Sequence, residues 1–181
     1  DILVRDPGGA PVGGATVFVR DGQGRITDAM SFHATDSGGH CLYKGLAGGS
    51  YTVLARQGAN ASEESAPVSL RAGETIPVEV DLGPGAILWV RFRVKDDGEV
   101  PAHVQVTDAA GRDVTALLGL ADIQALYQKG GFSPSEHRIG PLAPGKYRVH
   151  AWNDEGLSAK KNVVIEAGER EQRFTLRLEA D

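Results

Sequence analysis

The sequence LAGGSYTV occupies residues 46–53 and returns as LAPGKYRV at residues 142–149. Both copies read L-A-x-G-x-Y-x-V, and each is followed by a hydrophobic run that ends in glycine and glutamate, at Gly73-Glu74 and at Gly168-Glu169. A phrase that is duplicated within a duplicated context indicates two copies of one structural unit. This repeat decides how the rest of the chain is divided.

A second pair of matching segments lies upstream of the repeated phrase. Residues 12–25 and 100–112 both place Ala, Val and Val at every second position, which is the period of a half-buried strand. In both segments Asp-x-x-Gly follows, and this pattern predicts a turn. Between Arg112 and Leu142 the second copy holds about nine more residues than the first, so the two copies differ mainly there.

The alternation predicts an all-β chain of two tandem β-sandwich domains, the second with a short helical insertion. We expect the first domain over residues 1–83 and the second over residues 84–181, joined by a hinge at Gly83-Pro84-Gly85. Strands are expected near residues 2–5, 15–20, 26–34, 40–46, 50–56, 66–71 and 75–82, and then near residues 87–95, 102–107, 136–140, 146–152, 161–166 and 171–178.

The insertion, at about residues 113–135, is the stretch that does not read as strand. Leu120, Ile123 and Tyr127 stand at helical spacing, and Thr115 is a suitable residue to cap the start of a helix. Two interpretations stay open: a helix that covers an open end of the sandwich, or a protruding surface for a partner or ligand.

Composition and charge exclude several classes of protein. The 181 residues include 24 glycines, as expected when many short strands need tight turns, and the net charge is −5. An acidic chain with scattered Lys and Arg has no electrostatic footprint for nucleic acid. No apolar stretch approaches the roughly 18 residues of a membrane span, so no membrane insertion is expected. Because the chain opens directly on an apolar strand pattern at residues 2–4, we expect a segment of a longer protein.

The single cysteine, Cys41, excludes an internal disulfide. Alternation places Cys41 and Tyr43 on the same face of a strand, and a cysteine in that setting behaves as a small hydrophobic residue. A buried core thiol is therefore expected.

The first half of the chain resembles a known family. TDSGGHCLYKGLAGGSYTV at residues 35–53 resembles the T-D-x-x-G-x-[FY]-x-[FY]-x-x-L-x-x-G-x-Y-x-V signature of carboxypeptidase regulatory-like domains, and VGGATV at residues 12–17 resembles their opening strand. The resemblance implies that both domains are Ig-like, prealbumin-like (transthyretin-like) β-sandwiches, similar also to the B-type repeats of collagen adhesins. The second half keeps the opening strand and the repeated phrase but lacks the T-D-x-x-G turn, where residues 132–135 stand instead.

Members of that family are mostly non-catalytic accessory, spacer or adhesive modules of secreted, periplasmic or surface proteins. The resemblance therefore implies a non-catalytic accessory, spacer or protein-interaction module of a larger exported or cell-surface protein. Its partners would be other domains of the parent protein or another protein, and its location would be extracellular, periplasmic or at the cell surface.

The sequence offers no set of residues for catalysis. Its histidines and its cysteine lack the spacing of a zinc site, and no nucleophile elbow, phosphate loop or dinucleotide fingerprint occurs. Residues 96–99, DDGE, include oxygen ligands that calcium accepts, but they read more simply as a solvated hairpin tip. We expect no enzyme, no cofactor, and no catalytic, cofactor-binding or metal-binding residues.

The two tryptophans bear on the alternative function. Trp152 lies on the outward register of its strand, beside Asn153 and Asp154. These three residues are candidates for ligand binding, and they support carbohydrate binding through exposed aromatic rings as the alternative to a spacer. In the competing interpretation, the insertion covers Trp152. Trp89 also lies on the outward register, close to the hinge, and is the candidate for a contact between the domains.

Overall fold

The computed structural model describes every residue except 29, 96–97, 116, 120–134 and 181. The described residues form strands and turns, without a helix. Accordingly, none of the described segments is a helix of the length and apolarity needed to cross a membrane. The prediction of an all-β chain is confirmed.

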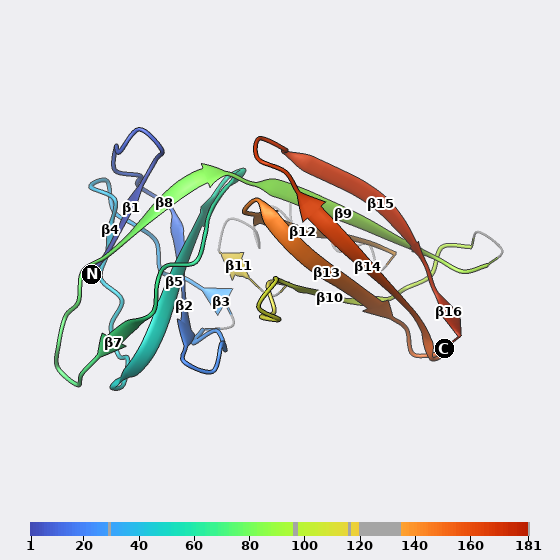
Figure 1. The fold of residues 1–181 in the computed structure, drawn as a ribbon, viewed down its shortest axis with the longest axis horizontal. Coiled ribbons are helices and arrows are strands. Elements are labelled where there is room, and N and C mark those ends of the chain that lie inside the picture. Colours follow the sequence, from blue (N-terminus) through green and yellow to red (C-terminus); the bar gives the residue numbers. More distant parts are fainter. Residues whose placement is uncertain (29, 96–97, 116, 120–134, 181) are drawn as a thin grey trace.

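The N-terminal half is a sheet wrapped around a core of its own (Figure 1). Its strands are β1 (Ile2–Arg5), β2 (Thr16–Asp21), β3 (Met30–Ser31), β4 (His40–Cys41), β5 (Gly49–Gln57), β6 (Asn60–Ser62), β7 (Val68–Leu70) and β8 (Val78–Pro84). Seven of them form one sheet in the order β2-β5-β6-β8-β1-β4, with β7 paired to β5. The first residues of β8 pair with β1 and its last residues pair with β6. Because β8 takes part in both pairings, it joins the two layers that enclose the core.

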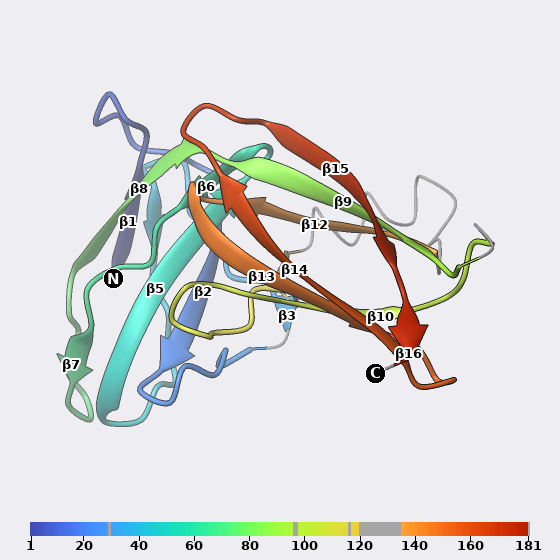
Figure 2. The same ribbon diagram turned by 45° about the vertical axis from the view of Figure 1, so that its right-hand side comes forward.

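The C-terminal half consists of two sheets packed face to face, which Figure 2 shows as two layers. Its strands are β9 (Ala86–Arg93), β10 (His103–Thr107), β11 (Leu118–Gly119), β12 (Glu136–Leu142), β13 (Gly145–Trp152), β14 (Leu157–Ile165), β15 (Glu171–Arg177) and β16 (Glu179–Ala180). One sheet has the order β10-β13-β14-β16 and the other the order β12-β9-β15. Apolar side chains from both sheets fill the space between them, among them Leu88, Phe92, Val106, Val149 and Val163.

The same strand pairing recurs in both halves. In the first, β1 lies between antiparallel β4 and parallel β8. In the second, β9 lies between antiparallel β12 and parallel β15. Likewise β5 pairs with β2 and β7, as β13 pairs with β10 and β14. The repeat in the sequence thus corresponds to a repeat in strand pairing.

The repeated phrase makes the same local structure twice. Near the start of β5 the Tyr51 hydroxyl donates to the Ala47 carbonyl at 3.0 Å, and near the start of β13 the Tyr147 hydroxyl donates to the Ala143 carbonyl at 2.7 Å. Each ring is half-buried against the core of its own half. A tyrosine that bonds backbone a few residues upstream fixes the corner where a strand begins.

The loop expected at Gly83-Pro84-Gly85 is mostly strand in the structure. Gly83 and Pro84 are the last residues of β8, where they pair with Ala61 and Asn60. Only Gly85 separates β8 from β9, and β8 runs on into β9 in Figure 1. A proline is tolerated at the end of a strand, where its missing N–H is not needed by the ladder. The two halves are therefore joined by nearly continuous extended backbone.

Two expected strands are much shorter in the structure. Of residues 26–34 and 40–46, only β3 and β4 are regular strand. Side-chain hydroxyls take over backbone bonding nearby: the Ala15 N–H donates to Thr35 Oγ1 at 2.9 Å, and Thr35 Oγ1 donates to the Val12 carbonyl at 2.6 Å. Such side-chain bonds compete with a ladder and shorten it.

Most of the predicted helical insertion, residues 120–134, lies outside the described residues. Its expected beginning is wrong, because Leu118–Gly119 form β11, which pairs in parallel with β3. Thr115 is not a helix cap, since its hydroxyl accepts the Val106 N–H at 2.6 Å. At residues 118–119, backbone pairing with the N-terminal half thus replaces the expected start of the helix, where Gly119 already weakens helix formation.

Candidate functional site

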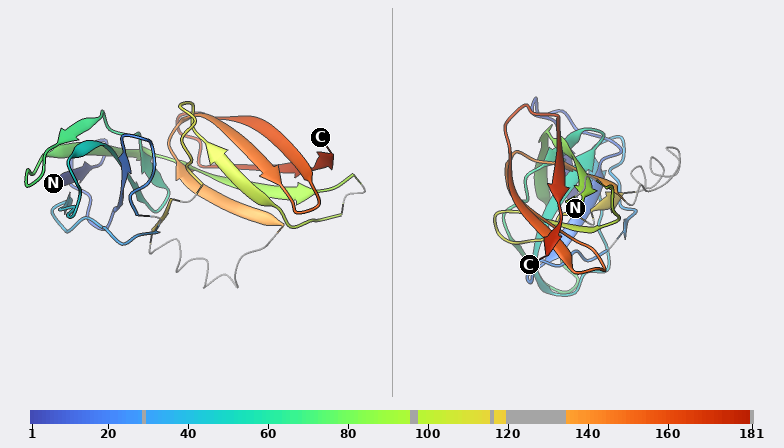
Figure 3. Two further views of the ribbon diagram at one scale, coloured as in Figure 1. Left: turned by 90° about the horizontal axis from the view of Figure 1, so that it is seen from below. Right: turned by 90° about the vertical axis from the view of Figure 1, so that its right-hand side faces the viewer.

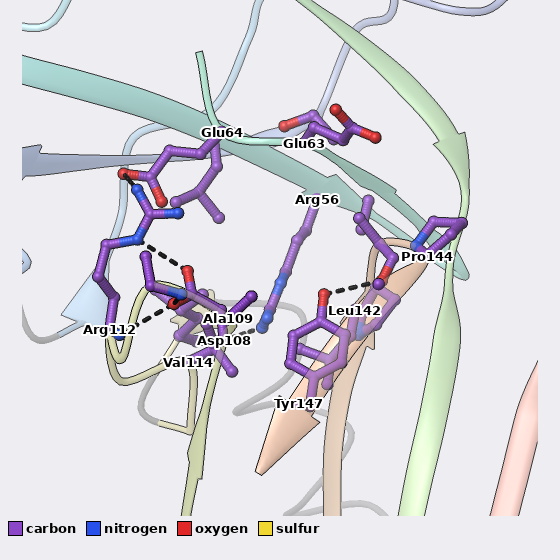
Figure 4. Close-up of a pocket in the computed structure, with 18 of the residues that line it drawn as sticks. Arg56, Glu63, Glu64, Asp108, Ala109, Arg112, Val114, Leu142, Pro144 and Tyr147 are labelled. Carbon is purple, nitrogen blue, oxygen red and sulfur yellow. Dashed lines mark hydrogen bonds and ion pairs between the residues drawn. The ribbon is translucent and has the colours of Figure 1, made fainter. Parts of the chain in front are cut away.

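A cleft of about 390 Å³ lies between the two halves of the chain. Arg56 of β5 and Glu64, which follows β6, stand on the N-terminal side (Figure 4). Asp108 and Arg112, in the turn after β10, and Tyr147 of β13 stand on the C-terminal side. Figure 3 shows the two halves end to end, so this cleft lies at their junction.

Arg20 of β2 is the most deeply buried charged residue of the junction, with an exposed fraction of 1 %. Its guanidinium donates to the Gly24 carbonyl at 3.0 Å and, across the junction, to the Asp113 carbonyl at 2.7 Å. Arg20 Nε lies 3.4 Å from Glu64 Oε2. Burial lowers the pKa of the guanidinium, and the neighbouring Glu64 carboxylate opposes that shift. Arg20 is thus held by groups from both halves.

Glu64 connects the two halves through a pair of arginines. Its Oε1 lies 2.8 Å from Arg112 of the C-terminal half, while its Oε2 faces Arg20 of the N-terminal half. Arg112 is oriented in turn by Asp108, whose Oδ2 lies 2.7 Å from Arg112 Nε. A carboxylate shared by two guanidiniums offsets part of the cost of taking these charges out of water.

Arg56 makes a further crossing. It has an exposed fraction of 5 %, and its guanidinium donates to the Leu117 carbonyl at 2.9 Å. The same guanidinium lies 5.9 Å from the centre of the Phe18 ring. Phe18 and Leu54, from β2 and β5, pack into the hydrophobic core of the C-terminal half and not into that of their own half. Both faces of these strands are therefore buried.

The chemistry of the cleft is that of a structural junction. Arg20, Arg56 and Arg112 are engaged with carboxylates or backbone carbonyls, and the Tyr147 hydroxyl bonds the Ala143 carbonyl. Burial raises the pKa of Tyr147 to about 12, so its hydroxyl stays protonated at neutral pH. Within the part of the chain that the structure describes, no group of His, Cys, Asp and Glu side chains is arranged to hold a metal ion.

The candidate residues Trp152, Asn153 and Asp154 lie together at the far end of β13, away from the cleft. The Trp152 ring is 37 % exposed and lies 5.0 Å from the His150 ring and 5.7 Å from the His103 ring. Asn153 shapes the turn, because its Oδ1 accepts backbone N–H groups of residues 155 and 157. Asp154 Oδ1 lies 3.3 Å from His103 Nε2. The outward register expected for Trp152 is therefore observed.

Trp89 lies within the sheet β12-β9-β15, between Arg138 and Arg173 on the neighbouring strands. The Arg173 guanidinium lies 4.8 Å from the centre of its ring. A hydrogen bond from Trp89 contributes, after that from Arg173, to the lowered pKa of Glu171. These contacts all belong to the C-terminal half, and the expected contact of Trp89 with the first domain stays a prediction.

Cys41 is buried at 5 % exposure, in the core of the N-terminal half. Burial raises the pKa of its thiol. A buried thiol of raised pKa is a poor nucleophile, which agrees with the core role expected from the alternation.

Sequence reasoning missed the residues that join the halves: Arg20, Arg56, Glu64 and Arg112. The available signal was in β2, where Val17 and Val19 alternate with Phe18 and Arg20. A strand with large side chains on both faces is more consistent with burial on both sides than with a solvated outer face.

The N-terminal half is similar to a known family. Residues 2–83 match the carboxypeptidase regulatory-like domain. No curated protein matches the chain significantly.

Similar solved structures are more distant. The TIE protein of Bacillus anthracis is 15 % identical with a TM-score of 0.37, over 98 % of this chain and 33 % of that one. Shaft pilin SpaA from Lactobacillus rhamnosus GG is 7 % identical with a TM-score of 0.37, over 99 % of this chain and 97 % of that one. BcpA, the major pilin subunit of Bacillus cereus, is 7 % identical with a TM-score of 0.37, over 99 % and 98 % of the two chains. The chain thus spans about a third of the TIE protein. Structural similarities with a TM-score of 0.37 carry no inference about function. The sequence match to the carboxypeptidase regulatory-like domain is limited to residues 2–83.

Proposed function

We propose that this chain is a non-catalytic spacer or protein-interaction module of a larger exported or cell-surface protein. In this proposal, residues 1–83 and 84–181 are two β-sandwich units held at a fixed angle. The family of residues 2–83 supports the accessory role and the exported location. The observation that carries the rigid geometry is the buried arginine junction between the halves.

The junction takes charged side chains out of water, and this desolvation costs free energy. Burying a guanidinium such as that of Arg20 carries a desolvation penalty that only well-placed partners offset. Those partners, Glu64 and the Asp113 carbonyl, lie on both sides of the junction. Separation of the halves would strip Arg20 of a partner and expose Phe18 and Leu54 to water. These penalties favour one arrangement over a flexible tether.

The connection by backbone supports the same conclusion. A single residue, Gly85, separates β8 from β9, and its N–H donates to the Ala59 carbonyl at 3.0 Å. A second link joins the halves where Arg170 Nη1 lies 3.3 Å from Asn60 Oδ1. A spacer needs this property, because it must transmit an orientation as well as a distance.

Distance measurement between spin labels at the two ends tests the proposal. Glu74 and Glu155 are exposed and lie in different halves, so E74C and E155C in a C41A background provide the label sites. We expect a narrow distance distribution, which R20M together with R56M broadens. R91M is the matched control, because Arg91 forms an exposed ion pair with Glu136 inside the C-terminal half. A broad distribution before any junction residue is changed would refute the rigid spacer.

A further inference from the structure

The outward face of the sheet formed by β10, β13 and β14 carries an uninterrupted array of polar and aromatic side chains. The register aligns His103 with Trp152 and Ser158, Gln105 with His150 and Lys160, and Thr107 with Arg148 and Asn162. Residues directly opposite one another in a ladder share a face. We call these nine residues the open face; the three strands lie side by side in Figure 1.

The open face is hollowed and positively charged. A shallow depression of about 590 Å³ lies over it, lined by Arg148 and Lys160 together with Lys161. The lining contains no carboxylate, and among the described residues no ion pair joins Arg148 or Lys160 to an acid. The chain as a whole has a net charge of −5. Cations gathered without counter-charges on an acidic protein create a local field that attracts anions.

The acidic groups near the open face stand at its rim and have partners. Asp113 Oδ2 accepts the Gln105 amide at 3.0 Å, and Asp154 faces His103 at 3.3 Å. Asp113 lies beside the edge strand β10, where it pairs with Thr107, and Asp154 follows the far end of β13. Among the described residues neither carboxylate forms an ion pair with Arg148 or Lys160, so these two cations are available to a ligand.

An exposed aromatic ring completes the open face. Trp152 lies on the same side of β13 as Arg148, four residues further on, which corresponds to about 13 Å along the strand. Between them stands His150, whose ring is 5.0 Å from that of Trp152. Amide and hydroxyl groups of Gln105, Thr107 and Asn162 lie beside the cations. These groups both donate and accept hydrogen bonds, as sugar hydroxyls require.

We propose that the open face binds an extended acidic glycan, with sugar-borne carboxylates on Arg148 and Lys160 and an uncharged face of a sugar ring stacked on Trp152. A guanidinium recognises a carboxylate in bidentate fashion. The indole offers a flat apolar surface with a polar edge. This binding goes beyond the proposed spacer role and uses no residue of the junction.

Titration with three probes at low ionic strength, followed by calorimetry, tests this inference. Oligogalacturonate supplies both sugar and carboxylate, its methyl ester supplies the same sugar without charge, and polyglutamate supplies carboxylate without sugar. We expect oligogalacturonate to bind, the other two to bind at least tenfold more weakly, and binding to weaken as salt screens the face.

Variants assign the binding to the open face. R148Q and K160Q should each lower the affinity for oligogalacturonate roughly tenfold, the scale of a charge-assisted hydrogen bond. W152A should lower it roughly five- to tenfold. The matched control is K44Q with R71Q, which removes two exposed cations of the N-terminal half and should leave the affinity unchanged. Equal binding of polyglutamate, an unchanged affinity in W152A, or no binding of oligogalacturonate would each overturn the proposal.

Discussion

Two equivalent sheet faces have opposite fates in this molecule. In the N-terminal half the outer face of β2 and β5 carries Phe18 and Leu54, and both are buried by the C-terminal half. In the C-terminal half the equivalent positions of β10 and β13 carry Gln105 and His150, which lie on the open face. The same strand pairing therefore supports a buried junction in one copy and a solvated surface in the other.

The two copies share a buried inner face and differ in what covers the outer face. Inner positions such as Val53 and Val149 are buried in both copies, because each must fill a core of its own. Outer positions face whatever the rest of the chain places there. Between these two sheets, the difference in burial is therefore concentrated on their outer faces.

The largest effect should come from deleting the aromatic ring on the covered face. F18A should lower the free energy of unfolding by about 3–5 kcal/mol, because the ring is fully buried and leaves a cavity at the junction. Q105A, at the equivalent position of the open face, should change it by less than about 0.5 kcal/mol. Urea unfolding of both variants measures the contrast, and similar losses would mean that the two faces are not differently covered.

A comparison of two arginines should give the next largest effect. R20M removes one partner of a buried ion pair and should cost about 3 kcal/mol, since Glu64 keeps Arg112 but the Asp113 carbonyl loses its donor. R148M, on the open face, should be neutral within about 0.5 kcal/mol. Thermal unfolding of the two variants measures the difference. An R20M variant as stable as R148M would show that the arginine junction does not hold the halves together.

A smaller effect should distinguish two equivalent turns. Asp21 and Asp108 each accept two backbone N–H groups through Oδ1 and each pair with the arginine four residues on. D108A should cost about 1–2 kcal/mol, because Arg112 also holds Glu64 across the junction. D21A should cost less, since Arg25 is largely exposed. Denaturant titration of both variants provides the test, and a larger loss in D21A would contradict it.

The turn that begins at Asp21 also gives a prediction for stability at acidic pH. Backbone N–H donation, chiefly from Arg25, lowers the pKa of Asp21 below its ordinary value of 3.8. The unfolded state therefore takes up the proton first, so the contribution of Asp21 is present above that pH and is lost as the pH falls below it. Between pH 5 and pH 2, the free energy of unfolding should fall less steeply in D21N than in the unaltered protein. Equal slopes would contradict the lowered pKa of Asp21.

The smallest effect concerns the two tyrosine corners. Y147F and Y51F each remove one hydrogen bond to a backbone carbonyl, which should lower the free energy of unfolding by about 1 kcal/mol. The loss should be larger in Y147F, because the Tyr147 hydrogen bond is less exposed than that of Tyr51. The pKa of Tyr147 is raised from 10.0 to about 12. The unfolded state thus ionises first, and stability that is complete below pH 10 is lost between pH 10 and pH 12.

Ultraviolet titration detects this ionisation. Y147F should remove part of the phenolate absorbance that appears near pH 12 and should make alkaline unfolding shallower. Tyr43, whose pKa burial also raises to about 12, also contributes to the late absorbance. An unchanged late titration in Y147F would contradict the burial of this ring.

Local patterns were readable from the sequence because the forces behind them act over few residues. Alternation located β2, β5, β9 and β13 to within one or two positions, and Asp-x-x-Gly located the turns that begin at Asp21 and Asp108. In the strand expected over residues 26–34, the Ser31 hydroxyl donates to the Val17 carbonyl, and regular strand is limited to β3. Periodicity does not report such competing bonds.

The amino-acid sequence was enough to predict the repeat, the all-β class, the inward faces of the strands and the outward register of Trp152. Period-two alternation carries this information, because it depends only on the pleat of one strand. What covers the outward faces depends on long-range packing: Arg20 and Arg56 meet carbonyl groups 93 and 61 residues away in the chain. An outward side chain is buried or solvated according to how the two halves pack, and no local pattern encodes that packing.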